Sequence, residues 1–234
     1  MTRRALALFL TFLLPVLLAA CGGGAPGASA AMFSDSSWTT SYFDPPGVLV
    51  VGSPTMTELA NAAGPVHVID HSANGLQLAE LLRGGPVLMG AAVGQTVQPL
   101  TLQLGSELAR YVVFGLGHVE ALFTDTTPSE FAATAREAVV AVRAAGKTPI
   151  LLGLIRFAPS QLITPTMIAR RDAFDAVLAR VAAEEGVPFV DQGAARFDGP
   201  ADVRPDLLHP GAAYNQRRAA LVAQRLAQIT GAMQ

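Results

Sequence analysis

The sequence predicts a single α/β domain in which helices cover both faces of a mainly parallel sheet of five strands, a three-layer α/β/α arrangement. Short apolar runs alternate along the chain with longer segments of helical periodicity. Uninterrupted apolar runs suit strands that are buried on both faces of a parallel sheet. Regular alternation of strand and helix implies right-handed crossovers, and therefore one doubly wound sheet.

The predicted strands are the apolar runs at 48–51, 66–69, 111–114, 149–152 and 188–190. The predicted helices occupy the segments between them and after the last one, at 57–62, 76–82, 128–145, 165–185 and 211–229. The helix from Pro128 has a capping residue, Thr127, before a proline at its first position, and glycines end two of the helices. Residues 84–105 fit neither pattern and are expected to hold a short strand and an irregular connection.

The N-terminus has the features of an export signal. Arg3 and Arg4 precede an apolar run over 5–18, which is too short for a membrane-spanning helix of about 20 residues. Leu18-Ala19-Ala20-Cys21 resembles a bacterial lipobox, and Cys21 is the only cysteine. This predicts a lipoprotein signal peptide over 1–20 and acylation of Cys21, which would anchor the protein in a membrane. The alternative is an ordinary signal with an incidental cysteine.

The segment after Cys21 is predicted to be a flexible tether. Residues 21–46 are rich in glycine, serine and threonine, and a turn sequence, Asp44-Pro45-Pro46-Gly47, ends the tether before a domain over 47–234. Loss of residues 1–20 changes the balance to 14 basic and 18 acidic residues, a net charge of −4, with no basic cluster that would suit nucleic acid. The expected location is the bacterial cell envelope, with the outer membrane, facing the periplasm, favoured by Gly22.

Candidate catalytic residues follow the predicted strands, because function in such sheets lies at the carboxyl ends of the strands. Gly52-Ser53 follows the first strand, Gly117-His118 follows the third, and Asp206 and His209 precede the last helix. An aspartate three residues before a histidine can orient the imidazole, as in the acid and base of a serine hydrolase triad. The alternative is an aspartate that only caps a turn.

These residues occur in an order that resembles the SGNH (GDSL-like) hydrolases, a family with a flavodoxin-like architecture. Its members carry a G-D-S block after the first strand, a glycine after the second, a G-x-N-D block after the third and D-x-x-H-P before the last helix. The resemblance covers about residues 47–230. It implies that Asp206 and His209 are the catalytic acid and base, and that Asn74-Gly75 forms the second block, in which Gly75 donates its N–H to an oxyanion.

The first and third blocks depart from the family pattern. Gly52 matches the first glycine, but Ser53 and Pro54 replace Asp-Ser, so Ser53 is predicted as the nucleophile through a shift of one residue. The alternative is that Ser53 only caps a helix. In the third block Gly117 matches, whereas Val119 and Glu120 replace Asn-Asp, and His118 is a candidate for the missing oxyanion donor.

The predicted activity is hydrolysis of a small ester or an acylated glycan by a Ser-His-Asp triad in an envelope-anchored protein. No cofactor is implied, and no metal site is expected because no metal-ligand spacing occurs. The protein is expected to be a monomer. The alternative is a catalytically inactive envelope lipoprotein that keeps the fold and serves as a binding or scaffolding protein, since proline replaces the nucleophile in the ungapped alignment.

Overall fold

The fold is described from a computed structural model. The described residues are 28–35, 37–38, 41–44, 48–51, 59, 62–63, 66–90 and 93–232; for 41–44 and 48–51 only the backbone is described. The N-terminal segment with Cys21, and also Gly52 and Ser53, lie outside these ranges.

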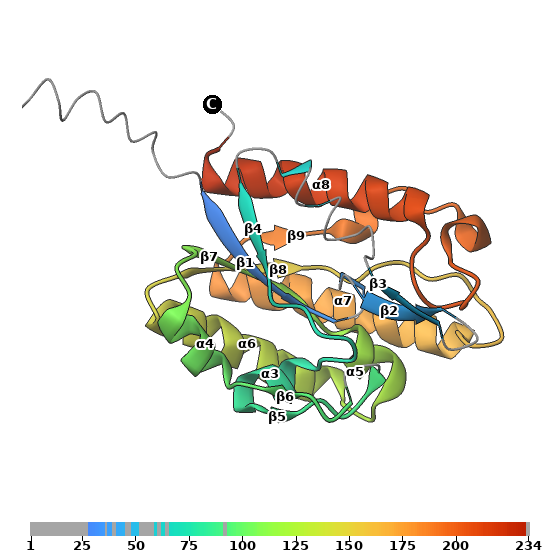
Figure 1. Ribbon diagram of the computed structural model, residues 1–234, viewed down its shortest axis with the longest axis horizontal. Helices are drawn as coiled ribbons and strands as arrows, with labels where there is room; N and C mark the ends of the chain where they lie inside the picture. Colours follow the sequence, from blue (N-terminus) through green and yellow to red (C-terminus); the bar gives the residue numbers. More distant parts are fainter. Residues whose placement is uncertain are drawn as a thin grey trace, which may run out of the picture.

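The core of the molecule is a five-stranded parallel sheet, which confirms the predicted fold class (Figure 1). Its order is β4-β1-β7-β8-β9, the 2-1-3-4-5 order of flavodoxin-like sheets when strands are counted along the chain. The strands are β1 (Ser29–Ser34), β4 (His67–Asp70), β7 (Tyr111–Gly115), β8 (Thr148–Leu152) and β9 (Phe189–Val190).

Strand β1 corrects the prediction, because residues 29–34 were assigned to the tether. Ala31 pairs with Ile69 of β4 and with Val112 of β7, so β1 is an interior strand with neighbours on both sides. Ala30, Ala31, Met32 and Phe33 are all fully buried. Side chains alternate along a strand, so these four serve both faces of the sheet. The domain therefore includes residues from 29 onward and does not start at 47.

The predicted first strand at 48–51 exists but does not belong to the parallel sheet. It is β3 (Val48–Val51), which pairs antiparallel with β2 (Ser41–Asp44) in a separate two-stranded sheet. Antiparallel strands can be joined by a tight connection, and only the Pro45-Pro46-Gly47 segment separates these two in the sequence. The premise that Ser53 follows the first strand of the sheet is therefore wrong.

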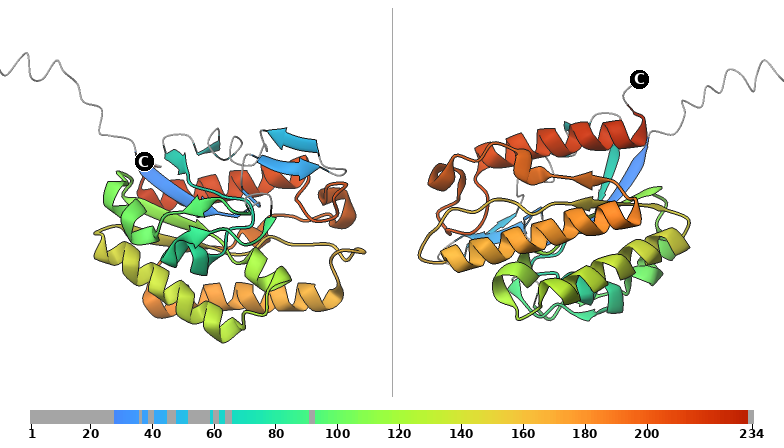
Figure 2. Two further views of the ribbon diagram at one scale, coloured as in Figure 1. Left: turned by 60° about the horizontal axis from the view of Figure 1, so that its bottom comes forward. Right: turned by 180° about the vertical axis from the view of Figure 1, so that it is seen from behind.

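Helices cover the two faces of the sheet unequally (Figures 1 and 2). Helix α8 (Ala212–Thr230) packs on one face, against a core that includes Met32, Val113 and Ile150. On the other face lie α3 (Leu78–Arg83), α4 (Leu100–Ser106), α6 (Pro128–Ala144) and α7 (Pro165–Glu185). The ranges of α3, α6, α7 and α8 agree with the predicted helices to within two residues at each end. The predicted helix at 57–62 lies mostly outside the described residues.

Several short elements had no clear sequence signal. The segment 84–105 contains the small hairpin β5 (Gly85–Pro86) and β6 (Thr96–Val97), followed by α4. Helix α5 (His118–Phe123) begins three residues after the end of β7, and the 3₁₀ helices η2 (Gln192–Ala194) and η3 (Gly199–Asp202) lie between β9 and α8. Within the described residues, no helix has both the length and the apolar composition needed to cross a membrane.

Candidate active site

Asp206 and His209 form a hydrogen-bonded pair in the loop before α8. The Nδ1 of His209 lies 2.7 Å from Oδ2 of Asp206. The other carboxylate oxygen, Oδ1, accepts the backbone N–H groups of Leu208 (2.9 Å) and His209 (2.8 Å). One short turn therefore fixes the carboxylate and the imidazole relative to each other, which is the geometry that the D-x-x-H spacing predicts.

This arrangement determines which nitrogen of His209 can act as a base. Burial of Asp206 opposes ionisation, but hydrogen bonds from the His209 side chain and from the Leu208 and His209 backbone hold the pKa of the Asp206 carboxyl below its usual range. An ionised carboxylate only accepts, so Nδ1 of His209 carries the hydrogen. In the neutral ring Nε2 then has the lone pair that a general base needs.

The backbone of this turn is constrained at its base and strained at its centre. Val203 and Pro210 form an antiparallel bridge, and Arg204 N–H donates to the carbonyl of His209 (2.9 Å). Between them Leu207 has a φ of 61°, the only positive φ at a non-glycine position in the described chain. Such strain costs about 1–3 kcal/mol and persists only where the surroundings impose it. The strained residue lies between the acid and the base.

The carboxyl end of β1 meets this pair across a pocket. Asp35 and Ser37 line the pocket together with His118 and His209, and Asp35 and His118 are both at most 5% exposed. The sequence here is Ser34-Asp35-Ser36, which differs from a G-D-S block only in its first residue. Ser36 itself lies outside the described residues, but it is covalently joined to two residues that line the pocket. This block is hard to predict from the sequence, because residues 29–34 contain no β-branched residue and follow a glycine-rich segment.

Most of the pocket wall is apolar. The pocket has about 300 Å³ of empty space, part of which is open to solvent. Its apolar lining comes from α5, from the segment after β8 and from the loop that carries His209: Val119, Leu122, Phe123, Ile155, Phe157, Leu208 and Pro210. A few polar groups at the base of an apolar cleft are typical of small-molecule sites.

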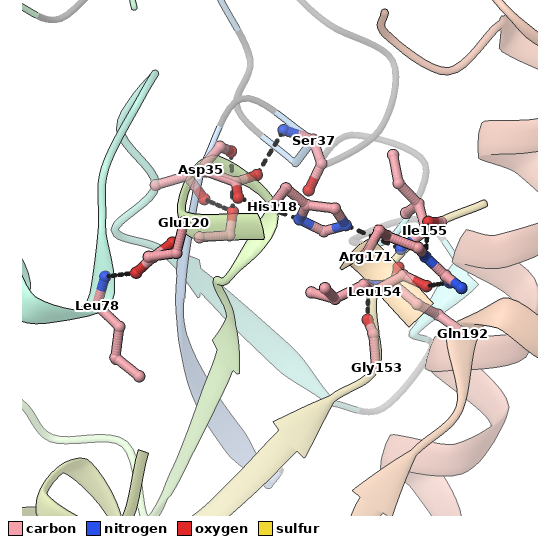
Figure 3. Close-up of polar contacts among 12 residues, drawn as sticks. Asp35, Ser37, Leu78, His118, Glu120, Gly153, Leu154, Ile155, Arg171 and Gln192 are labelled. Carbon is pink, nitrogen blue, oxygen red and sulfur yellow. Dashed lines mark hydrogen bonds and ion pairs between the residues drawn. The ribbon is translucent and has the colours of Figure 1, made fainter. Parts of the chain in front are cut away.

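His118 connects two sides of this pocket (Figure 3). Its Nδ1 lies 3.1 Å from Oδ2 of Asp35, and its Nε2 accepts the backbone N–H of Ile155 at 2.8 Å. Oδ1 of Asp35 accepts the N–H of Ser37 at 2.9 Å. Burial of Asp35 opposes ionisation, yet its interactions with His118 and Ser37 keep the pKa of Asp35 below its ordinary value.

The two predicted oxyanion glycines, Gly75 and Gly117, both have a positive φ. Gly75 follows β4 with a φ of 80°, and a Cβ on it would lie 1.9 Å from the carbonyl oxygen of Met89, so the position requires glycine. Gly117 has a φ of 123° and precedes α5. The pocket lining does not include Asn74, Gly75 or Gly117 among the described residues. Their oxyanion roles stay predictions. No three described His, Cys, Asp or Glu side chains lie close enough to hold a metal ion.

Glu120, which replaces the aspartate of the third block, is buried next to this site without belonging to the triad. Its Oε1 accepts the N–H of Leu78 (2.6 Å), and no group within hydrogen-bonding range faces Oε2 in the described part of the chain. Burial is the main cause that raises the pKa of Glu120 to about 8, and the nearby charges of Asp35 and Glu80 add to it. The carboxyl is therefore protonated at neutral pH.

This burial predicts a pH-dependent stability difference for Glu120→Gln. The unfolded chain ionises above the ordinary value of 4.5, while the folded protein keeps its proton up to about pH 8. Between these values the unfolded state binds fewer protons, so wild-type stability falls as pH rises. The neutral variant, which keeps an oxygen for Leu78, lacks this loss and should be more stable by about 2–5 kcal/mol at pH 8.5 and by little at pH 4.5.

Urea unfolding of both proteins across this pH range measures the difference, with the exposed Glu137→Gln as a matched control. Parallel pH profiles for wild type and Glu120→Gln would contradict a buried protonated carboxyl.

The chain is similar to known proteins in sequence and in fold. The sequence model of the GDSL-like lipase/acylhydrolase family matches residues 52–217. No curated protein matches the chain significantly. Among solved structures, an inhibitor-bound aryl esterase of M. smegmatis has a TM-score of 0.68 at 18% identity, covering 86% of this chain and 99% of that one.

A carbohydrate acetylesterase, Est24 of Sinorhizobium meliloti, has a TM-score of 0.68 at 16% identity, covering 86% of this chain and 99% of that one. A lipase/acylhydrolase of Enterococcus faecalis has a TM-score of 0.61 at 19% identity, covering 88% and 97%. Each of these matches covers 86–88% of the chain, which is more than the share that lies between Gly52 and the last residue. Each match therefore includes residues before Gly52. At these identities the matches to solved structures show the fold alone. The family model covers most of the chain and therefore shows the family. The chain is a member of the GDSL-like lipase/acylhydrolase family.

Proposed function

We propose that the protein is an ester hydrolase in which Ser36 is the nucleophile, His209 the general base and acid, and Asp206 the residue that orients His209. One observation carries this proposal: both sequence neighbours of Ser36 line the same pocket as His209, whose Nδ1 is bonded to Asp206. Ser36 also completes a Ser-Asp-Ser sequence directly after β1, the strand position at which the family carries G-D-S.

In this mechanism the hydroxyl of Ser36 attacks the ester carbonyl while Nε2 of His209 takes its proton. The resulting charge on the imidazole is stabilised by the Asp206 carboxylate. His209 then protonates the leaving alkoxide, and an acyl-enzyme remains. Water repeats the sequence with His209 as base, which releases the carboxylic acid and restores Ser36. Donors to the oxyanion are expected from the backbone, with Gly75 the leading candidate.

A serine-directed fluorophosphonate probe tests this proposal without a choice of substrate. We expect stoichiometric labelling of the folded protein, with the adduct mapped by mass spectrometry to the peptide that contains Ser36. Labelling of the peptide with Ser53 would instead support the shifted first block. A folded protein that neither labels nor hydrolyses p-nitrophenyl esters would favour the alternative of an inactive binding lipoprotein.

The apolar pocket wall supports an ester with a small apolar acyl group as the substrate, in preference to a bare acetyl group on a polar glycan. Burial of one methylene is worth about 0.8 kcal/mol, so kcat/KM should rise about fourfold per methylene from the acetate to the butanoate ester of p-nitrophenol. Phe123, which lines the pocket and is 37% exposed, should contribute to this preference. Phe123→Ala is expected to reduce the butanoate-to-acetate ratio several-fold.

Leu102→Ala is the matched control, because Leu102 is 64% exposed on α4 and does not line the pocket. Equal kcat/KM values for the acetate and butanoate esters, or an unchanged ratio in Phe123→Ala, would exclude this apolar wall as the acyl site.

We also propose that the protein is exported and anchored to the cell envelope by acylation of Cys21, with its catalytic domain facing the periplasm. The Leu-Ala-Ala-Cys sequence after a short apolar run supports this. The mass of the mature N-terminal peptide tests it. A diacylglyceryl cysteine at the new N-terminus is expected, and Cys21→Ser should release the protein from the membrane fraction.

A further inference from the structure

His118 occupies a position where three pocket segments meet. It is the first residue of α5, separated from β7 by Leu116 and Gly117, and it is 5% exposed. Its ring contacts Asp35 from the end of β1 and Ile155 from the segment after β8, and it stands edge-on to Phe157 with ring centroids 6.0 Å apart. Figure 3 shows the imidazole between Asp35 and Ile155.

The two hydrogen bonds of His118 define a single form of the ring. A backbone N–H can only donate, so Nε2 of His118 must be the unprotonated nitrogen that accepts from Ile155. The hydrogen is then on Nδ1 and points at Oδ2 of Asp35. The neutral Nδ1–H tautomer satisfies both partners. In this form neither nitrogen has a lone pair available for proton transfer, so His118 is not a second base.

Both partners of His118 are held by further hydrogen bonds. Asp35 accepts the N–H of Ser37 with its other oxygen, and the carbonyls of Ile155 and Leu154 accept hydrogen bonds from the buried guanidinium of Arg171, with Nε 2.6 Å from the Ile155 oxygen. The chain Ser37–Asp35–His118–Ile155–Arg171 thus joins the ends of β1 and β8 to helix α7. A buried polar chain of this kind is stable only when each member is satisfied.

The end of β7 provides a second alignment of this sequence with the third family block, G-x-N-D. Strand β7 ends at Gly115, and when the first glycine of G-x-N-D is placed there, Gly117 takes the place of the asparagine and His118 that of the aspartate. In this alignment, as in the one that starts at Gly117, the block lacks its asparagine. The side chain of an asparagine is therefore not available to shape the pocket. The buried side chain of His118 contacts both Asp35 and Ile155, which line the pocket.

We infer that His118 is a positioning residue, which orients the Asp35–Ser37 segment, and with it the attacking serine, through the hydrogen bond from its Nδ1–H to Asp35. This inference rests on the proposed function. Its chemical content is specific: the bond from Nδ1–H to Asp35 orients the segment of the nucleophile, and the bond from Ile155 to Nε2 selects the tautomer that can donate it. Displacements of about 1 Å from productive geometry can cost about 10²-fold in rate.

Three substitutions of His118 distinguish the contributions of its two hydrogen bonds, to Asp35 and from Ile155. Asparagine places a donor near the position of Nδ1 and keeps the contact with Asp35, glutamine reaches the position of Nε2 but not that of Nδ1, and phenylalanine keeps the ring without either bond. We expect kcat to fall at least about 10²-fold in His118→Phe and His118→Gln, and to recover to within about tenfold of wild type in His118→Asn, with KM within threefold throughout. His67→Asn, at an exposed histidine of β4, is the matched control.

Circular dichroism and thermal melts restrict the comparison to folded variants. A folded His118→Phe protein with kcat within threefold of wild type would overturn the inference, as would equal losses in the Asn and Gln variants. Long-range ¹H–¹⁵N NMR of the wild type provides a readout that needs no turnover: the Nδ1–H tautomer is expected, and an Nε2–H or doubly protonated His118 at neutral pH would also overturn it. Absence of wild-type esterase activity, by contrast, would contradict the proposed function.

Discussion

Ser36→Ala is expected to lower kcat for ester hydrolysis by about 10⁴-fold or more, and Ser53→Ala to leave it within threefold of wild type. Removal of the hydroxyl that forms the acyl-enzyme closes the covalent route, and only the binding and electrostatic contributions of the site remain. The two serines are matched controls for each other, because each follows a strand and each is the serine of one candidate alignment of the first block.

The measurement is steady-state hydrolysis of p-nitrophenyl butanoate, together with fluorophosphonate labelling of both variants. Loss of activity and labelling in Ser36→Ala alone assigns the nucleophile to the end of β1. Loss in Ser53→Ala alone would show that the family block starts at Gly52, where the match of the family model also begins. Retention of full activity in both variants would require a different hydroxyl.

Asp206→Asn and His209→Ala are each expected to lower kcat by about 10⁴-fold. The reasons differ. His209→Ala removes the base, whereas asparagine at position 206 can direct an N–H at Nδ1 of His209 and favour the tautomer with the hydrogen on Nε2. That tautomer cannot accept the serine proton. KM should change little in either variant, because the pocket wall is left in place.

The exposed Asp125→Asn is a control for Asp206→Asn. Since the pKa of Asp206 lies below its usual range, its carboxylate persists into more acidic solution than that of an ordinary aspartate. Loss of activity as pH falls toward 5 is therefore expected to report protonation of a group other than Asp206. A kcat in Asp206→Asn within tenfold of wild type would show that the 2.7 Å contact with His209 is not needed for turnover.

Local patterns were sufficient for the long helices and for the loop before the last helix. Helices α6 and α7 begin at Pro128 and Pro165, where capping threonines precede prolines, and their periodic apolar faces continue to glycine stops. The Asp206 and His209 pair was also predictable, because both bonds of Asp206 to His209 span only three residues. Such short-range features depend on the sequence within one turn.

The first strand of the parallel sheet was assigned wrongly for an equally physical reason. Val48–Val51 has the β-branched residues typical of a buried strand, but an antiparallel neighbour, separated from it by three residues in the sequence, forms the local partner. Ala30–Phe33 has weaker strand propensity and becomes a strand only through pairing with β4 and β7, which lie about 40 and 80 residues further along the chain. Strand propensity depends strongly on such tertiary context.

The sequence by itself determined the α/β class, the helices that follow a proline and a cap, the Asp206–His209 pair and the kinship with the family, because each of these follows from short stretches of sequence and their order along the chain. The tertiary structure decided which apolar run is the first strand of the parallel sheet, which serine therefore follows it, and that His118 joins Asp35 to Ile155. Those relations connect residues that are 37 to 83 positions apart. Only the packing of the sheet brings them together, so no local pattern of side chains could predict them.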